Sequence, residues 1–180
     1  MSASKGAGRA PARPWASDAL SWLIGPTGHQ EFFDRYYERE ALIVPRDEPD
    51  RFAPLLSIAH IDGLIASADL RSNMIDLADA GRELDREQWI MDGGAVDRAV
   101  VAHQHALGAT IILQQLHLSD PDLAAFCRAM EKTFSCHVQT NIYLTPPSAQ
   151  GFHTHYDNHD VFVLQVEGEK RWRLYGMPVA

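Results

Sequence analysis

The feature that most constrains the fold is a change in the spacing of apolar residues after Phe134. Before that point they recur every three or four positions, as on one face of a helix, and after it they alternate, as along a strand. Helices are predicted at 17–23, 27–39, 57–68, 96–107 and 119–134, and strands at 41–44, 74–78 and 109–114. The end of the chain is predicted to be all strand, at 137–145, 161–166 and 170–175. The chain is therefore of the α+β class.

Local signals mark the starts of several predicted helices. Thr27 with Gln30 is typical of a capping box, and Ser57 and Ser119 stand where helix N-caps are expected. An aromatic stripe at helical spacing follows Thr27 and is interpreted as core packing rather than a cofactor site. It comprises Phe32, Phe33, Tyr36 and Tyr37.

Composition and charge exclude several classes of protein. At 180 residues, with 46% hydrophobic and 22% charged residues, the chain is predicted to form one soluble domain. No apolar run is long enough to cross a membrane, and residues 1–14 are expected to be a flexible tail rather than a secretory signal. Cys127 and Cys136 are expected to be buried, reduced thiols, which favours a cytoplasmic location. The net charge of −8 argues against direct nucleic-acid binding and suits a basic protein or peptide partner.

His155 and Asp157 stand two residues apart at the start of an extended, apolar stretch. Residues two apart on a strand point to the same face, so an imidazole and a carboxylate converge there. These groups are two of the three ligands of a 2-His-1-carboxylate iron site. The alternative is a polar strand end whose side chains face water, and the spacing alone leaves both interpretations open.

Two neighbouring stretches place polar groups beside that pair. Asn141 and Tyr143 share one face of the predicted strand 137–145, which is either a solvated outer face or the wall of a polar cavity. On the predicted strand 170–175, Lys170 shares a face with Trp172 and Leu174. If that face points inward, the ammonium needs an anionic partner, because burying it unpaired is expensive. The alternative is that Lys170 extends to water.

The order and spacing of these motifs carry a resemblance. The segment NIYLTPPSAQGFHTHYDNHDVFVLQVEGEKRWRLYG closely resembles the JmjC-type cupin oxygenases of the ribosomal oxygenase (cupin-4) group. FFDRYYEREALIVPR, near the front, is similar to that family's N-terminal segment. The resemblance implies a double-stranded β-helix at 96–180, preceded by a helix and strand region at 15–95.

Carried over residue by residue, the resemblance implies a role for each polar group. His155 and Asp157 would bind Fe(II), and Lys170 would pair with the far carboxylate of the co-substrate 2-oxoglutarate. Asn141 and, less directly, Tyr143 would line the co-substrate pocket. Two further histidines do not match family ligand positions. They are His153, the better candidate for substrate contact, and His159, an expected rim or surface residue.

The sequence also departs from the family. The family's distal metal histidine lies on a later strand, and no residue here matches it, so the third ligand is absent from the chain. Neither His117 nor His137 is placed by the sequence to substitute for it. The closing strands of the barrel and the helical region used for dimerisation are missing too, so a homodimer is an expectation for the full-length form only. Because both ligands and Lys170 are retained, the chain is expected to be a C-terminally truncated enzyme rather than a degenerate relative.

The resemblance therefore predicts an Fe(II)/2-oxoglutarate-dependent oxygenase that hydroxylates a side chain of a protein or peptide. Ribosomal-protein arginine or histidine is the substrate class it implies, and this truncated chain is expected to be inactive. Two alternatives remain from other classes: a non-catalytic cupin-like interaction module, and a different cupin chemistry such as a metal-dependent isomerase.

Overall fold

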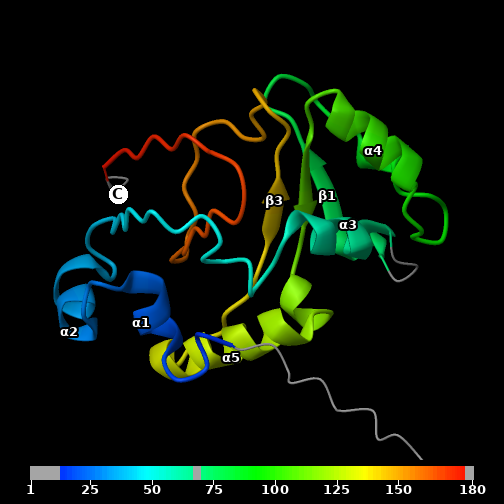
Figure 1. Cartoon of the computed structure of the whole chain (residues 1–180). Coiled ribbons are helices and arrows are strands. Elements are labelled where there is room, and N and C mark those ends of the chain that lie inside the picture. Colours follow the sequence, from blue (N-terminus) through cyan, green and yellow to red (C-terminus); the bar gives the residue numbers. More distant parts are fainter. Residues whose placement is uncertain (1–12, 67–69, 177–180) are drawn as a thin grey trace, which may run out of the picture.

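A small antiparallel sheet stands at the centre of the molecule, with helices around it (Figure 1). The computed structural model describes residues 13–66 and 70–176. Apart from Arg13 and Pro14, the expected tail at 1–14 lies outside the described residues. The helices are α1 (Ala19–Ile24), α2 (His29–Glu31), the π-helix η1 (Phe32–Tyr36), α3 (Ile58–Ala66), α4 (Arg98–Ala106), α5 (Pro121–Phe134) and the short 3-10 helices η2 (Ser72–Met74), η3 (Arg86–Gln88) and η4 (Leu116–Leu118). The strands are β1 (Ile75–Ala78), β2 (Thr110–Leu113) and β3 (Ile142–Leu144).

β2 is the central strand and pairs with β1 on one side and β3 on the other, in the order β1-β2-β3. In register, Ile75 lies opposite Leu113 and Ile111 lies opposite Leu144. All four residues of β2 are buried, which agrees with a β-branched, apolar strand covered on both faces. The predicted strands at 74–78 and 109–114 are therefore confirmed. The division at residue 95 stays a prediction, and the sheet takes β1 from before it and β2 and β3 from after it.

α5 packs its apolar side on the core, where Leu123, Phe126 and Met130 are buried. Its N-cap is Asp120 rather than the predicted Ser119, because the Asp120 carboxylate accepts hydrogen bonds from the backbone N–H groups of Asp122 and Leu123, at 2.9 and 2.8 Å. Asp120 is itself buried, and its other oxygen lies 3.1 Å from the Nε2 atom of His60 on α3. This one side chain therefore joins two helices that are far apart in the sequence.

The predicted helix at 27–39 is only partly confirmed. It begins at His29 after Gly28, which gives no side-chain cap, so the capping box at Thr27 is wrong. The chain then widens into the π-helix η1, a local form that changes which side chains meet. Phe33 and Tyr37 pack on Phe134 of α5, with ring centroids 5.8 and 5.4 Å apart. The interpretation of the aromatic stripe as core packing is confirmed.

Two arginines in the loop after η1 attach this loop to the C-terminal end of α1. Arg46 donates to the carbonyl oxygens of Leu23 and Gly25, and Arg51 donates to that of Trp22. These are carbonyls that the end of a helix leaves without partners, and positive charge is favourable there. The predicted strand at 41–44 is wrong, since this segment pairs with no strand among the described residues.

The end of the chain differs most from prediction. Only Ile142–Leu144 of the predicted strand 137–145 is a strand, and 161–166 and 170–175 form none. An extended segment becomes a strand only when a neighbouring strand pairs with its N–H and C=O groups, and no described residue pairs with these segments. Leu164 and Val166 still lie against the core while Val161 and Val163 are exposed, so the alternation itself is retained.

Cys127 is buried as expected, but Cys136 is exposed, and both are free thiols. Burial raises the pKa of the Cys127 thiol, whose sulfur lies 3.1 Å from the hydroxyl of Thr140. Cys136 lies just beyond Ser135, whose left-handed backbone ends α5 and turns the chain towards solvent. None of the helices in the described part of the chain is long and apolar enough to cross a membrane.

Candidate metal and co-substrate site

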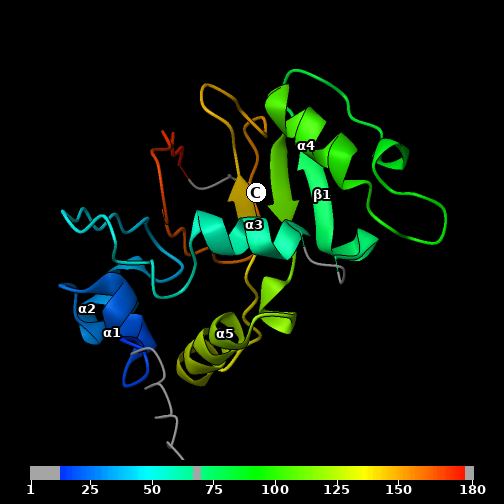
Figure 2. The same ribbon diagram turned by 45° about the vertical axis from the view of Figure 1, so that its right-hand side comes forward.

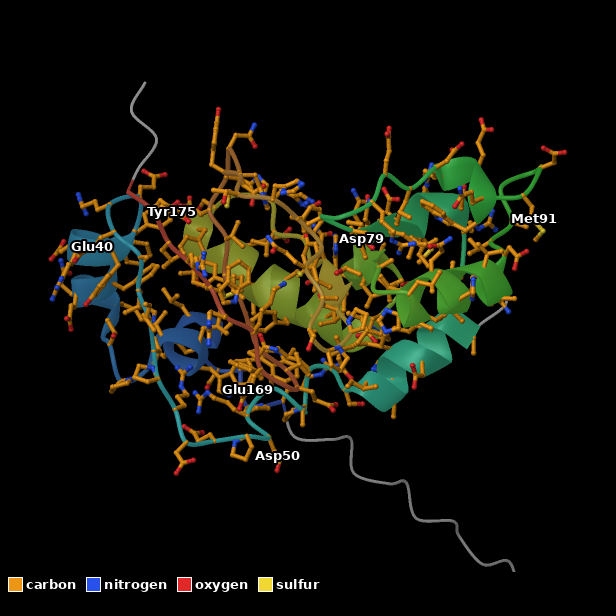
Figure 3. All side chains as sticks on the ribbon, turned by 90° about the horizontal axis from the view of Figure 1, so that it is seen from above. Glu40, Asp50, Asp79, Met91, Glu169 and Tyr175 are labelled. Atoms are coloured by element: carbon orange, nitrogen blue, oxygen red, sulfur yellow. The ribbon has the colours of Figure 1, made fainter. Side chains whose placement is uncertain are left out.

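The residues singled out from the sequence lie at the start of β3, on it, or on the segment from residue 145 to 176, which runs along one side of the sheet (Figures 1 and 2). Figure 3 shows the last part of this segment, between the labelled Glu169 and Tyr175, on the same side of the molecule as the labelled Glu40 and Asp50. The segment has no regular secondary structure. Its geometry therefore depends on the individual contacts that attach it to the rest of the molecule.

Gly151 attaches the start of this segment to the central strand. The carbonyl of Gln150 accepts a hydrogen bond of 2.8 Å from the Ala80 N–H at the end of β1. A Cβ atom at Gly151 would lie 2.6 Å from Oγ1 of Thr110 on β2, closer than any such pair of atoms packs. Thr110 is buried, and its hydroxyl hydrogen-bonds that of Thr145 at 3.0 Å. Only glycine lets the backbone come this close.

Phe152, the next residue, connects β3 to the predicted metal ligand. Its ring makes an edge-on contact with Tyr143 at 5.9 Å and a tilted contact with the imidazole of His155 at 5.5 Å. Such aromatic pairs have preferred geometries and are favourable beyond the area they cover. Phe152 therefore restricts where the His155 ring lies.

The hydrogen bonding of His155 determines which of its nitrogens is available. Nδ1 lies 2.8 Å from the carbonyl oxygen of His153. A carbonyl oxygen only accepts, so Nδ1 carries the proton, and in the neutral imidazole Nε2 keeps its lone pair. A metal-binding histidine commonly donates its other ring N–H in this way. This hydrogen bond favours the tautomer of His155 in which Nε2 can bind a metal.

The other predicted ligand is less constrained. Asp157 is exposed and makes no hydrogen bond or ion pair with a described residue. No group of three or more His, Cys, Asp or Glu side chains in the described ranges is placed to hold a metal ion. The residues present thus fit iron in chemical kind, as one imidazole and one carboxylate, but they supply two ligands rather than three.

His117 and His137, weighed as substitutes for the third ligand, lie together at the end of α5. Their rings are 5.8 Å apart, and Nδ1 of His137 lies 3.3 Å from Glu131. Burial, together with the nearby His137, lowers the pKa of His117. Nδ1 of His117 accepts from the Thr140 N–H at 3.3 Å. This pair belongs to the packing at the end of α5.

Lys170 points back towards β3. Its ammonium nitrogen lies 4.9 Å from the centre of the Trp172 ring and 5.9 Å from that of Tyr143. Partial desolvation lowers the pKa of Lys170, although the residue as a whole is exposed. The structure thus brings Lys170, Tyr143, Phe152 and His155 into one continuous line of contacts, although they are spread over 143–170 in the sequence.

Asn141 lies beside this line but faces elsewhere. Its side-chain oxygen accepts a hydrogen bond of 3.0 Å from the N–H of Gln115, a residue with φ of 51°. It therefore stabilises the turn after β2, and its place in a co-substrate pocket stays a prediction. His153 lines a shallow pocket with Asp79, Ser148 and Gln150, while His159 is exposed.

Sequence reasoning missed Phe152 and the contact of the Trp172 ring with the Lys170 ammonium. The alternation had placed Lys170 and Trp172 on one face, and their contact confirms that prediction. Nothing in the alternation identifies Phe152, because its contact with Tyr143 depends on how the segment crosses β3.

Comparison with known proteins shows what this chain is similar to. Residues 112–180 match the JmjC domain family, which implies a cupin or jelly-roll fold. The helices and the open three-stranded sheet are consistent with an incomplete barrel of that kind. The chain is homologous to cupin-type JmjC oxygenases over most of its length.

Individual relatives make the relationship more specific. The chain is 37% identical over 160 residues to a bifunctional lysine-specific demethylase and histidyl-hydroxylase NO66 of Drosophila mojavensis, covering 88% of this chain and 18% of that protein. It is 33% identical over 162 residues to ribosomal oxygenase 1 of Gallus gallus, covering 89% of this chain and 27% of that protein. The chain spans about a fifth to a quarter of the length of these curated relatives.

Proposed function

We propose that this chain carries part of the active site of an Fe(II)- and 2-oxoglutarate-dependent oxygenase that hydroxylates a side chain of a protein. The observation that supports this most is the line of contacts from Lys170 through Tyr143 and Phe152 to His155. It brings a cationic anchor and a metal-binding imidazole to one side of the sheet. If these residues were only a polar strand end facing water, Lys170 and His155 would have no reason to lie on the same line of contacts.

Each residue has a defined task in this proposal. His155, through Nε2, and Asp157 would hold the iron. Lys170 would receive the far carboxylate of 2-oxoglutarate, and Tyr143 would form the wall beside it. Iron bound there supplies the activation of O₂, coupled to oxidation of 2-oxoglutarate. The protein positions the substrate carbon and excludes water.

The substrate class is inferred from the relatives and from charge. The relatives' names specify lysine demethylation and histidyl hydroxylation, both on protein side chains. The net charge of −8 suits a basic protein, and a ribosomal-protein histidine or arginine fits this description. His153, on the rim of its shallow pocket, is the residue we place nearest the substrate.

Metal binding tests the proposal directly. Titration of the 180-residue chain with Mn(II), followed by electron paramagnetic resonance, should show weak binding that falls about tenfold or more in His155→Ala and Asp157→Ala. His159→Ala and Asp160→Ala are matched controls, since they remove the same residue types from the same exposed segment. Equal Mn(II) binding by all four variants would contradict the proposed metal site.

Turnover separates the oxygenase from the non-catalytic alternative. With Fe(II), 2-oxoglutarate and a histidine-containing basic peptide, we expect little or no succinate from this chain alone, because its described residues supply two ligands. Robust succinate formation would contradict the two-ligand argument. A second experiment exchanges this chain for the corresponding segment of a full-length relative. If that chimera binds metal and 2-oxoglutarate but shows no turnover, the interaction module is favoured.

A further inference from the structure

Lys170 is held in an unusual setting for a lysine in an exposed segment. The chain has three lysines, Lys5, Lys132 and Lys170, and the ammonium of Lys170 lies over two aromatic rings. No described carboxylate forms an ion pair with it. The aromatic rings, rather than an acidic side chain, therefore hold the charge.

The two rings come from different parts of the fold. Tyr143 belongs to β3, and its ring also makes an edge-on contact with that of Phe152. Trp172 follows Lys170 by two residues in extended chain, so both side chains point the same way. The segment that carries them is attached nearby, where the carboxylate of Glu167 accepts a hydrogen bond from the Ile58 N–H at 2.8 Å. Both ends of the Lys170 side chain are therefore positioned: the backbone by the nearby attachment of the segment, and the ammonium by the two rings.

We propose that Trp172 is a positioning residue, whose ring holds the ammonium of Lys170 against Tyr143 so that it is ready to receive the carboxylate of a dicarboxylate ligand. This rests on the proposed function for the identity of that ligand. A free lysine side chain samples many rotamers, and an anion that binds it must order them. A cation–π contact orders the side chain beforehand and leaves the N–H groups that face away from the rings available.

The contact itself can be tested without any ligand. Reductive ¹³C-methylation keeps the lysine charge and gives resolved signals for the three lysines, with Lys170→Arg assigning the signal of interest. The Lys170 methyl signal should lie upfield of that of exposed Lys132, because of ring currents. In Trp172→Leu it should move most of the way to the Lys132 position. Leu174→Ala, an exposed apolar change on the same face, should leave it unchanged.

Binding then tests the consequence. The affinity for 2-oxoglutarate, read from the same signal, should fall about two- to fivefold in Trp172→Leu, the range expected for an exposed cation–π contact. Trp172→Phe should retain part of this affinity, and Leu174→Ala should retain all of it. Trp172 is 53% exposed, so these variants leave the core intact, which circular dichroism checks.

The outcomes distinguish this inference from the function on which it rests. An unmoved Lys170 signal, or unchanged 2-oxoglutarate affinity in Trp172→Leu, overturns the positioning role while Lys170→Met can still show that the lysine binds the ligand. A ring-shifted Lys170 signal that does not respond to 2-oxoglutarate overturns the proposed function and leaves the Lys170–Trp172 contact established.

Discussion

Residues 13–144 and residues 145–176 are built on different principles. In the first region β2 is paired on both edges, and its Leu113 is 1% exposed. In the second region no described residue joins a strand, and Leu174 is 60% exposed although the alternation predicted a strand there. Burial thus fixes the first region as a whole, whereas the second is fixed at separate points. The candidate site lies mostly on the second.

Those points of attachment are few and specific. Gly151 lies against Thr110, the ring of Phe162 lies 5.7 Å from that of Phe134, and Glu167 binds the start of α3. Between them, the chain presents His155, Asp157 and Lys170. We infer that the geometry of the site depends on these anchors more than on local secondary structure. Three experiments test that difference between the regions.

The largest effect should come from the buried strand. Leu113→Ala removes a side chain that is 1% exposed and leaves a cavity, so the free energy of unfolding should fall by about 2–5 kcal/mol. Leu174→Ala makes the same chemical change at a side chain that is 60% exposed, and should change it by no more than about 0.5 kcal/mol. Urea denaturation followed by circular dichroism measures both. Equal losses would mean that the two regions do not differ in this way.

Gly151→Ala should have the next largest effect. The added methyl would lie 2.6 Å from Oγ1 and 3.0 Å from Cβ of buried Thr110, so the strand or the segment must shift. We expect a loss of about 1–3 kcal/mol in the free energy of unfolding. The contact between Phe152 and Tyr143 should be disturbed too, and the ring signals of Tyr143 in an NMR spectrum would report it.

Two controls isolate the cause of that loss. Gly63→Ala, in α3, meets no atom within 4 Å and should stabilise by about 0.5–1 kcal/mol, as alanine does in helices. Thr110→Ala combined with Gly151→Ala removes the closest atom and should recover part of the loss. A Gly151→Ala chain as stable as the parent, with unshifted Tyr143 signals, would show that Gly151 is no anchor.

The contrast between the regions also explains what could be predicted from the sequence. The periodicity and apolar runs located α4, α5, β1 and β2 because each buries apolar side chains in a core that the chain itself supplies. The site residues were proposed from their motif spacing and stay predictions, whereas the shared face of Lys170 and Trp172 was confirmed. Local rules therefore suffice where the structure is decided locally or by simple burial.

Other features depend on contacts that no local pattern encodes. Residues 161–166 have the composition of a strand, yet pairing is a property of two segments, and no described segment pairs with them. The π-helix η1 stands where an α-helix was expected, and Phe33 and its C-cap Tyr37 pack on Phe134, a hundred residues later in the chain. Asp120, the N-cap of α5, also pairs with His60 on α3. Each is a long-range interaction between groups that are individually unremarkable in sequence.

The smallest and most local effect should come from Glu167→Ala. The Glu167 carboxylate accepts a hydrogen bond from the Ile58 N–H, one of the groups that the start of α3 leaves without a partner inside the helix. Its loss should cost about 1 kcal/mol, the typical value of a capping side chain, and speed hydrogen exchange of the Ile58 amide about fivefold. Glu167→Gln keeps an acceptor and should behave like the parent, and Glu169→Ala, two residues on, is the matched control. Because the same hydrogen bond attaches the Lys170 segment, Glu167→Ala should also reduce the ring-current shift of Lys170. If exchange at Ile58 speeds up while Lys170 stays in place, then Trp172 and Tyr143 alone hold the lysine, and the segment has one anchor fewer than the structure indicates.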